Sequence, residues 1–216
     1  MGLFDVFKAK KCEVCGQKTT DFTEYKLTGF YSSVCTECYK KCSAELRSAD
    51  FAGFSPEKVR KHIEDKKADF QRFLKEFSES EAVTRGGEKW SKKIWAVDDS
   101  KGWWANMIAD KPDVFEFTQV KKWEVEIDTS YVTGDPINYN DGRPDRPEFP
   151  EVAKGKKIDR MDFIVYVEHP YITAVKIPLI DTTVEVNQKD IVSGYNAGVQ
   201  LLEAFEKYCE KFGKYE

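Results

Sequence analysis

The chain has 216 residues, of which 41% are apolar and 14% aromatic, and its formal net charge is -4. This composition is typical of a globular protein with one domain and an appendage, or with two small domains. The small net charge excludes a strongly charged tail as the feature that selects a partner. No apolar run approaches the roughly 18 residues that a membrane-spanning helix needs.

The N-terminal stretch MGLFDVFKAKK lacks the apolar core and the cleavage site of a secretory signal, so we expect a cytoplasmic protein. Three apolar residues precede three lysines, as in a short membrane-surface anchor: Leu3, Phe4, Phe7, Lys8, Lys10 and Lys11. Val6 stands where a lipidation motif requires serine or threonine. We therefore expect this stretch to pack on the module that follows, and a membrane surface is the less favoured partner.

Five of the six cysteines lie in CEVCG, residues 12 to 16, and CTECYKKC, residues 35 to 42. Two Cys-x2-Cys units separated by 19 residues have the spacing of a four-cysteine zinc site. In a reducing compartment such pairs are metal ligands more often than disulfides, and a thioredoxin-like redox pair would need a βαβ frame. The sequence predicts one structural Zn²⁺ per chain, bound by Cys12, Cys15, Cys35 and Cys38. Four thiolates leave no open position for a catalytic zinc.

The residues around these cysteines fit a zinc ribbon or knuckle. QKTTDFTEYKLTGFYSSV is typical of a short hairpin with a turn at Gly29, and Gly16 suits a tight turn after Cys15. Cys42 follows Cys38 by four residues, so it either replaces a ligand or is a small buried residue beneath the site, which we favour. Cys209 is expected to be a packed cysteine on the last helix.

Residues 1 to 47 carry eight Lys and Arg against six Asp and Glu. Four thiolates and one zinc ion add a charge of -2, which makes this module nearly neutral. Nucleic-acid binding needs a dense basic face, so it is the less favoured alternative.

FSPEKVRKHIEDKKADFQRFLKEF predicts a long amphipathic helix with Ser55 as N-cap and Pro56 at the first helical position. Its apolar stripe comprises Val59, Ile63, Phe70, Phe73, Leu74 and Phe77. We expect His62 to be solvated. The helix divides the chain into a zinc-ribbon-like module (1–47), a linking helix (48–80) and a β domain (81–216).

From Lys92 onward the pattern alternates, as in antiparallel strands. The expected strands are KKIWAVDD, GWWANMIA, VFEFTQV, KWEVEIDT, DRMDFIVYVEH and ITAVKIPLI, with a possible short one at TTVEV. A long loop at 131 to 157 interrupts them, which is either mobile or a recognition element. The final helix carries a stripe of Ile191, Tyr195, Val199, Leu202, Phe205 and Cys209. The predicted fold class is α+β, with a bent sheet or partial barrel and a C-terminal helix, as in pleckstrin-homology-like domains.

Adjacent Trp103 and Trp104 must point to opposite faces of a strand, so only one can enter the core. We expect the other to be covered by the 55–77 helix, with a role as partner anchor as the alternative. His169 is expected in a turn between two strands. The carboxylates of the β domain are expected on solvent-facing sides of strands: Asp98, Asp99, Glu124, Glu126 and Asp128.

The order MGLFD, CEVCG, CTECYKK, AVTR, DDSKGWW, PDVFEFTQVKKWEVEIDT, DFIVYVEHPYITAVKIPL and VEVN resembles a bacterial family of uncharacterised proteins. Members of that family have a zinc-ribbon-like domain followed by a β-rich domain. The resemblance implies Cys12, Cys15, Cys35 and Cys38 as the ligands and supplies no activity. Cys42 and the Trp103–Trp104 pair depart from the family pattern.

No phosphate loop, nucleophile elbow or histidine metal pair is present in the sequence. We therefore expect a non-catalytic, zinc-stabilised binding or scaffolding protein whose partner is another protein. A regulatory or nucleic-acid-binding zinc ribbon is the first alternative, and an enzyme with an unrecognised site in the β domain is the second.

Overall fold

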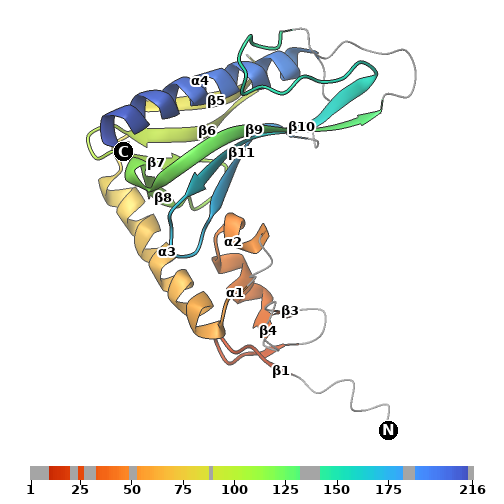
Figure 1. The fold of residues 1–216 in the computed structure, drawn as a ribbon. Coiled ribbons are helices and arrows are strands. Elements are labelled where there is room, and N and C mark those ends of the chain that lie inside the picture. The colour runs from red at the N-terminus through yellow and green to blue at the C-terminus, as the bar shows by residue number, and fades with distance from the viewer. Residues whose placement is uncertain are drawn as a thin grey trace. The chain divides into compact units, whose positions relative to one another are not determined.

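The computed structural model of the chain describes residues 10–19, 24–26, 33–48, 53–87, 90–131, 142–181 and 188–213 (Figure 1). Contacts divide the chain into two compact units, Met1–Lys75 and Glu76–Glu216. The N-terminal residues Leu3 to Phe7, which we expected to pack on the zinc module, the Gly29 turn and the possible TTVEV strand lie outside the described residues. The division of the chain at residues 47 and 80 stays a prediction.

The first unit begins with four very short strands. β1 (Lys10–Lys11) pairs antiparallel with β2 (Lys18–Thr19), and β3 (Glu24–Lys26) pairs antiparallel with β4 (Ser33–Cys35). The β3–β4 pairing is the one that the predicted hairpin requires. Two short helices follow, α1 (Thr36–Lys41) and α2 (Ala44–Ser48).

The long helix α3 (Pro56–Glu76) begins as predicted, because the Lys58 backbone N–H donates to Ser55 Oγ at 3.2 Å. Val59 is fully buried, whereas Leu74 near the other end of the apolar stripe is 61% exposed. The expectation of a solvated His62 is wrong, since this side chain is buried. The reason is its spacing: His62 lies three residues after Val59, and therefore on the same face of the helix.

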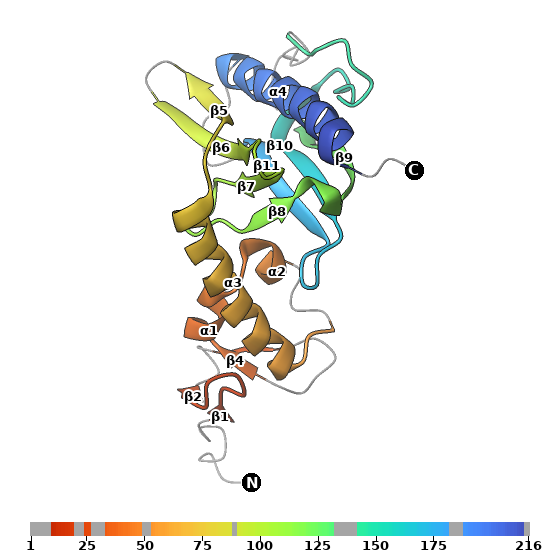
Figure 2. The ribbon, with the colours of Figure 1, turned by 90° about the vertical axis from the view of Figure 1, so that its left-hand side faces the viewer.

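The second unit contains two antiparallel sheets (Figures 1 and 2). The first is a four-stranded meander in the order β5-β6-β7-β8: β5 (Glu81–Gly87), β6 (Trp90–Asp98), β7 (Trp103–Asn106) and β8 (Val114–Glu116). The second has the order β11-β10-β9: β9 (Val120–Tyr131), β10 (Lys156–Val167) and β11 (Ala174–Ile180). A 3-10 turn, η2 (Phe117–Gln119), joins the sheets, and helix α4 (Gln188–Phe212) follows. The prediction of a mixed α and β fold with antiparallel sheets and a C-terminal helix is confirmed.

Helix α4 packs on both sheets through Phe205, which is completely buried. Five aromatic ring centroids lie 5.3 to 5.8 Å from that of Phe205: Trp95, Trp104, Phe117, Trp123 and Phe163. These rings come from β6, β7, η2, β9 and β10. The predicted burial of Leu202 and Phe205 is confirmed, and Val199 is partly buried.

Residues 142–155 form no helix or strand, yet this part of the predicted long loop is packed against α4. Phe149 is fully buried, and its ring centroid lies 5.5 Å from that of Tyr195 on α4. The guanidinium of Arg143 donates to the Phe149 carbonyl, with Nε at 3.0 Å. The described half of the loop is therefore tied to the core.

The two adjacent tryptophans point to opposite faces, as predicted. Trp104 is fully buried, with its ring centroid 4.7 Å from that of Phe115. Trp103 is half-buried, and Lys101 Nζ lies 4.6 Å from the centroid of its ring. Trp103 is therefore the outward member of the pair.

The prediction of a solvent-facing carboxylate is wrong for one of the five residues, Asp98. Asp98 is buried because it organises the β6–β7 turn: its carboxylate accepts from Ser78 N at 2.9 Å, Ser100 N at 3.1 Å and Ser100 Oγ at 2.6 Å. The others are partly or fully exposed: Asp99, Glu124, Glu126 and Asp128.

His169 lies between β10 and β11 as expected, and its Nδ1 accepts from Tyr171 N at 3.3 Å.

No helix within the described ranges is both long enough and apolar enough to cross a bilayer.

Candidate metal centre

The first two cysteines are presented by the turn that follows β1. Gly16 adopts a positive φ of 76° there, which other residues rarely adopt, and its N–H donates to the Cys12 carbonyl at 2.6 Å. The Cys12 N–H donates to the Gln17 carbonyl at 2.7 Å. The predicted tight turn at Gly16 is confirmed, and it brings Cys12 and Cys15 to the same side of the chain.

The second pair lies where β4 passes into α1. Cys35 is the N-cap residue of α1, and its Sγ accepts from the Cys38 backbone N–H at 3.4 Å. The Cys35 N–H in turn donates to Cys12 Sγ at 3.3 Å. Backbone amides directed at sulfur stabilise negative charge there, so the amide of Cys35 favours a thiolate at Cys12.

These turns bring all four predicted cysteines together. Their Sγ atoms lie within 4.8 Å of one another, and the Cys15 and Cys35 Sγ atoms are 3.7 Å apart. A tetrahedral site with metal–sulfur bonds of about 2.3 Å has sulfur–sulfur edges of about 3.8 Å. The four cysteines could therefore hold a metal ion with little rearrangement. Cys15 is exposed, and the other three are buried.

The protonation of the cluster depends on a compensating cation. Burial raises the pKa of Cys12, but hydrogen bonds from the Cys35, Cys15 and Val14 backbones outweigh it and lower that pKa to about 7. Burial raises the pKa of Cys38, and the neighbouring Cys15 and Cys35 side chains raise it further. One thiolate thus forms readily, whereas Cys38 keeps its proton unless a positive ion balances the charge.

Cys42 and Cys209 lie outside this cluster. Cys42 is buried, its Sγ donates to the Cys38 carbonyl at 3.4 Å, and burial raises its pKa to about 12. Cys209, a residue of α4, is buried in the core of the second unit. Both cysteines are therefore packing residues, as favoured from the sequence.

Two residues of α3 support the site, and sequence analysis missed both roles. Arg60 donates from Nε to the Val14 carbonyl at 3.1 Å and from a terminal nitrogen to the Glu13 carbonyl at 2.8 Å. His62 Nε2 accepts from the Ser43 N–H at 3.1 Å, and it lies 3.2 Å from Ser43 Oγ. Arg60 thus fixes the Cys12–Cys15 turn, and His62 fixes the α1–α2 connection. In the sequence, the only indication of these roles was that Arg60 and His62 lie close to Val59 on the predicted helix.

Over the described parts of the chain, these cysteines are the single group of three or more metal-ligating side chains. His169 and the carboxylates of β9 are not brought together into such a group. The carboxylate of Glu124 instead accepts from Tyr166 OH at 2.6 Å, and that of Glu126 pairs with Lys176 at 2.8 Å.

Comparisons of the chain with protein-family models, with curated proteins and with solved structures give no match. The resemblance to a bacterial family therefore rests on the sequence motifs alone.

Proposed function

We propose that Cys12, Cys15, Cys35 and Cys38 bind one structural zinc ion, and that the protein is a non-catalytic binding or scaffolding protein. The observation that carries the first part is the convergence of four sulfur atoms within 4.8 Å, with one pair, Cys15 and Cys35, at the 3.7 Å expected for an edge of a tetrahedral zinc site.

The chemistry of the ligands supports zinc in a structural role. Thiolates are soft ligands, and four of them in a tetrahedron select zinc or iron among the common metals. A cluster of several irons divides its four thiolates over different iron atoms and would hold some of the sulfurs further apart than the 4.8 Å within which all four lie here. Four protein ligands also leave no coordination position for a substrate.

The size of the elements supports the same role. The strands that carry the cysteines are two or three residues long, and such short pairs have little stability of their own. Small modules of this kind need a metal, disulfides or a partner to fold. A zinc ion that joins both Cys-x2-Cys turns would supply that stability.

The second unit supports a role in binding. Seven antiparallel strands in a four-stranded and a three-stranded sheet, followed by one long helix, suit a pleckstrin-homology-like domain. This is an analogy at the level of the fold, and it favours a binding module whose partner is another protein. We place the protein in the cytoplasm, where thiols stay reduced and available to zinc.

Metal analysis of the purified full-length protein tests the zinc site. We expect one zinc per chain, loss of the metal in Cys12→Ser and Cys38→Ser, and retention in Cys42→Ser and Cys209→Ser. The cobalt-substituted protein should show the absorption of tetrahedral thiolate coordination. Iron in place of zinc, or a full zinc content in Cys12→Ser, would contradict the proposal.

A further inference from the structure

The edges of the two sheets in the second unit differ in how they are covered. On β5, the Gly86 N–H donates to Ser193 Oγ of α4 at 2.9 Å. On β11, the Lys176 carbonyl accepts from Asn106 Nδ2 at 3.2 Å, and β8 has only three residues. Strand β9 has twelve residues and pairs with β10 alone in the described part of the chain. Among the described residues no strand therefore pairs with the second edge of β9, and an open strand edge is the usual template for an added strand.

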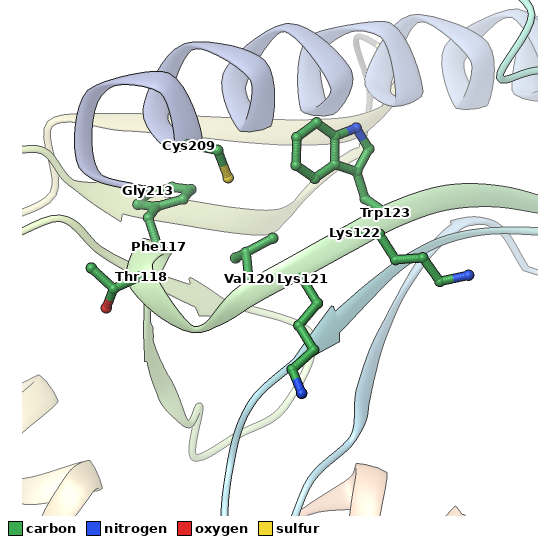
Figure 3. Close-up of a pocket in the computed structure, with 8 residues that line it drawn as sticks. All are labelled: Phe117, Thr118, Val120, Lys121, Lys122, Trp123, Cys209 and Gly213. Atoms are coloured by element: carbon green, nitrogen blue, oxygen red, sulfur yellow. The ribbon is translucent and has the colours of Figure 1, made fainter. Parts of the chain in front are cut away.

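A pocket lies beside the first half of this edge, between β9 and the C-terminal end of α4 (Figure 3). Its volume is about 370 Å³, within the range of roughly 300 to 1,000 Å³ found for ligand pockets. The lining comes from η2, β9 and α4: Phe117, Thr118, Val120, Lys121, Lys122, Trp123, Cys209 and Gly213. Figure 3 shows the Trp123 ring and Cys209 Sγ directed into the space below α4, which gives the pocket an apolar wall.

Two lysines stand on the other side of the same strand segment. Figure 3 shows that Lys121 and Lys122 extend away from α4, which two successive residues can do here because Lys121 is the extra residue of a bulge between Val120 and Lys122. Their ion pairs are loose and exposed, at 3.6 Å to Glu168 and 3.5 Å to Glu124. Exposed pairs of this kind are weak, so both lysines can exchange their carboxylate partners, although Lys122 Nζ also lies 4.2 Å from the centroid of the Tyr166 ring.

These features together define the chemistry of an occupant. Successive residues of a strand point to opposite faces, so a strand added beside β9 would direct alternate side chains toward α4 and toward the lysines. We propose that the β9 edge binds an extended peptide of a partner protein, with a large apolar side chain in the pocket and a neighbouring acidic side chain beside Lys121 and Lys122. This inference rests on the proposed role as a binding protein and names the class of partner.

The proposal is tested by selecting a displayed library of random linear peptides on the full-length, zinc-loaded protein. We expect the selected peptides to share an acidic residue next to a large apolar residue. A synthetic peptide of that consensus should slow hydrogen exchange in residues 117–131. Thr118→Trp, which adds a large ring at an exposed residue of the pocket lining, should weaken its binding more than about tenfold, and Lys121→Glu should weaken it by roughly threefold to tenfold.

Matched substitutions on the other sheet serve as controls. Thr84→Trp and Lys92→Glu change exposed residues of β5 and β6 and should leave the affinity unchanged. The proposal is overturned if no peptide is enriched or if Thr118→Trp binds the peptide as the parent protein does. It is also overturned if a higher protein concentration slows hydrogen exchange in β9 without any peptide, because that result would indicate self-association. Peptide binding that survives Thr118→Trp would leave the binding role intact and exclude only this site.

Discussion

At the scale of single residues, the chain shows which roles local spacing can predict. The metal cluster was predictable because each Cys-x2-Cys unit with its turn is a local structure, and the separation of the two units is characteristic. The roles of Arg60 and His62 were not predictable. Burial of a helix residue depends on which face meets the rest of the unit, and the charged neighbours Lys61 and Glu64 suggested a solvated one.

His62 gives the first prediction. His62→Ala leaves the buried Ser43 N–H without its acceptor, which should cost the first unit about 1 to 3 kcal/mol. We expect faster hydrogen exchange in residues 36–48 and metal loss at a lower chelator concentration. Lys61→Ala, one residue away and exposed, is the matched control. Unchanged exchange in His62→Ala would show that the Ser43 contact does not stabilise the site.

Asp98 gives a prediction that depends on pH. Burial raises its pKa, but hydrogen bonds from Ser100 and Ser78 and the charge of Lys101 outweigh burial and hold the pKa below the usual carboxyl value. The stabilisation is thus present above that usual value and is lost as the pH falls through the folded-state pKa. Asp98→Asn should cost about 1 to 3 kcal/mol at neutral pH, and the difference should shrink below about pH 4.

Urea unfolding of both proteins between neutral and acid pH measures this difference. Asp110→Asn, an exposed carboxylate in the same sheet region, should show no comparable pH dependence. If Asp98→Asn remains less stable than the parent protein by the same free energy of unfolding at acid pH, the charge of Asp98 is not what stabilises the turn.

At the scale of elements, the alternation of apolar and polar residues predicted the middle of most strands but not the residues at which they begin and end. The segment VFEFTQV was expected to be one strand, but it is the three-residue β8 followed by the turn η2. Strand β5 was missed because its end contains Gly86 and Gly87, which weaken a strand pattern. The pairing of β5 with β6 and its contact with α4 decide its conformation, and neither is local in sequence.

The packing of α4 on β11 gives a prediction about a helix glycine. A Cβ atom at Gly194 would lie 2.6 Å from Ile180 Cγ1 and 3.1 Å from the Leu179 carbonyl oxygen. Alanine favours a helix over glycine by about 1 kcal/mol, yet overpacking costs about 1 to 3 kcal/mol. We expect Gly194→Ala to be destabilising overall in urea unfolding followed by tryptophan fluorescence.

Asn196→Ala on the exposed face of α4 is the control for this change, and it should be neutral or stabilising. A stability gain in Gly194→Ala as large as that in Asn196→Ala would show that α4 can shift away from β11 without loss.

At the scale of the whole molecule, the two units are stabilised by different means. The large buried cluster draws its residues from Val83 to Cys209, whereas the first unit is organised around its cysteines. All five tryptophans lie in the second unit, so their fluorescence reports on that unit alone. We therefore expect more than one unfolding transition for this chain.

Metal removal should separate the two units experimentally. A strong chelator is expected to abolish the heat-absorption peak of the first unit in scanning calorimetry and to leave the tryptophan transition of the second unit in place. Cys12→Ser without chelator should give the same two results. A chelator-induced shift of the tryptophan transition would instead indicate that both units unfold as one.

The unequal exposure of the four cysteines has a consequence for kinetics. Three of the sulfur atoms are buried, and Cys15 is exposed. Among the four described cysteines, Cys15 offers an incoming thiol or chelator the most accessible side of an ion in this site, so ligand exchange at Cys15 would set the rate of metal transfer. The exchange rate should therefore rise with the concentration of the competitor. A site in which cysteines fill all four coordination positions could therefore still transfer its ion to a competing ligand.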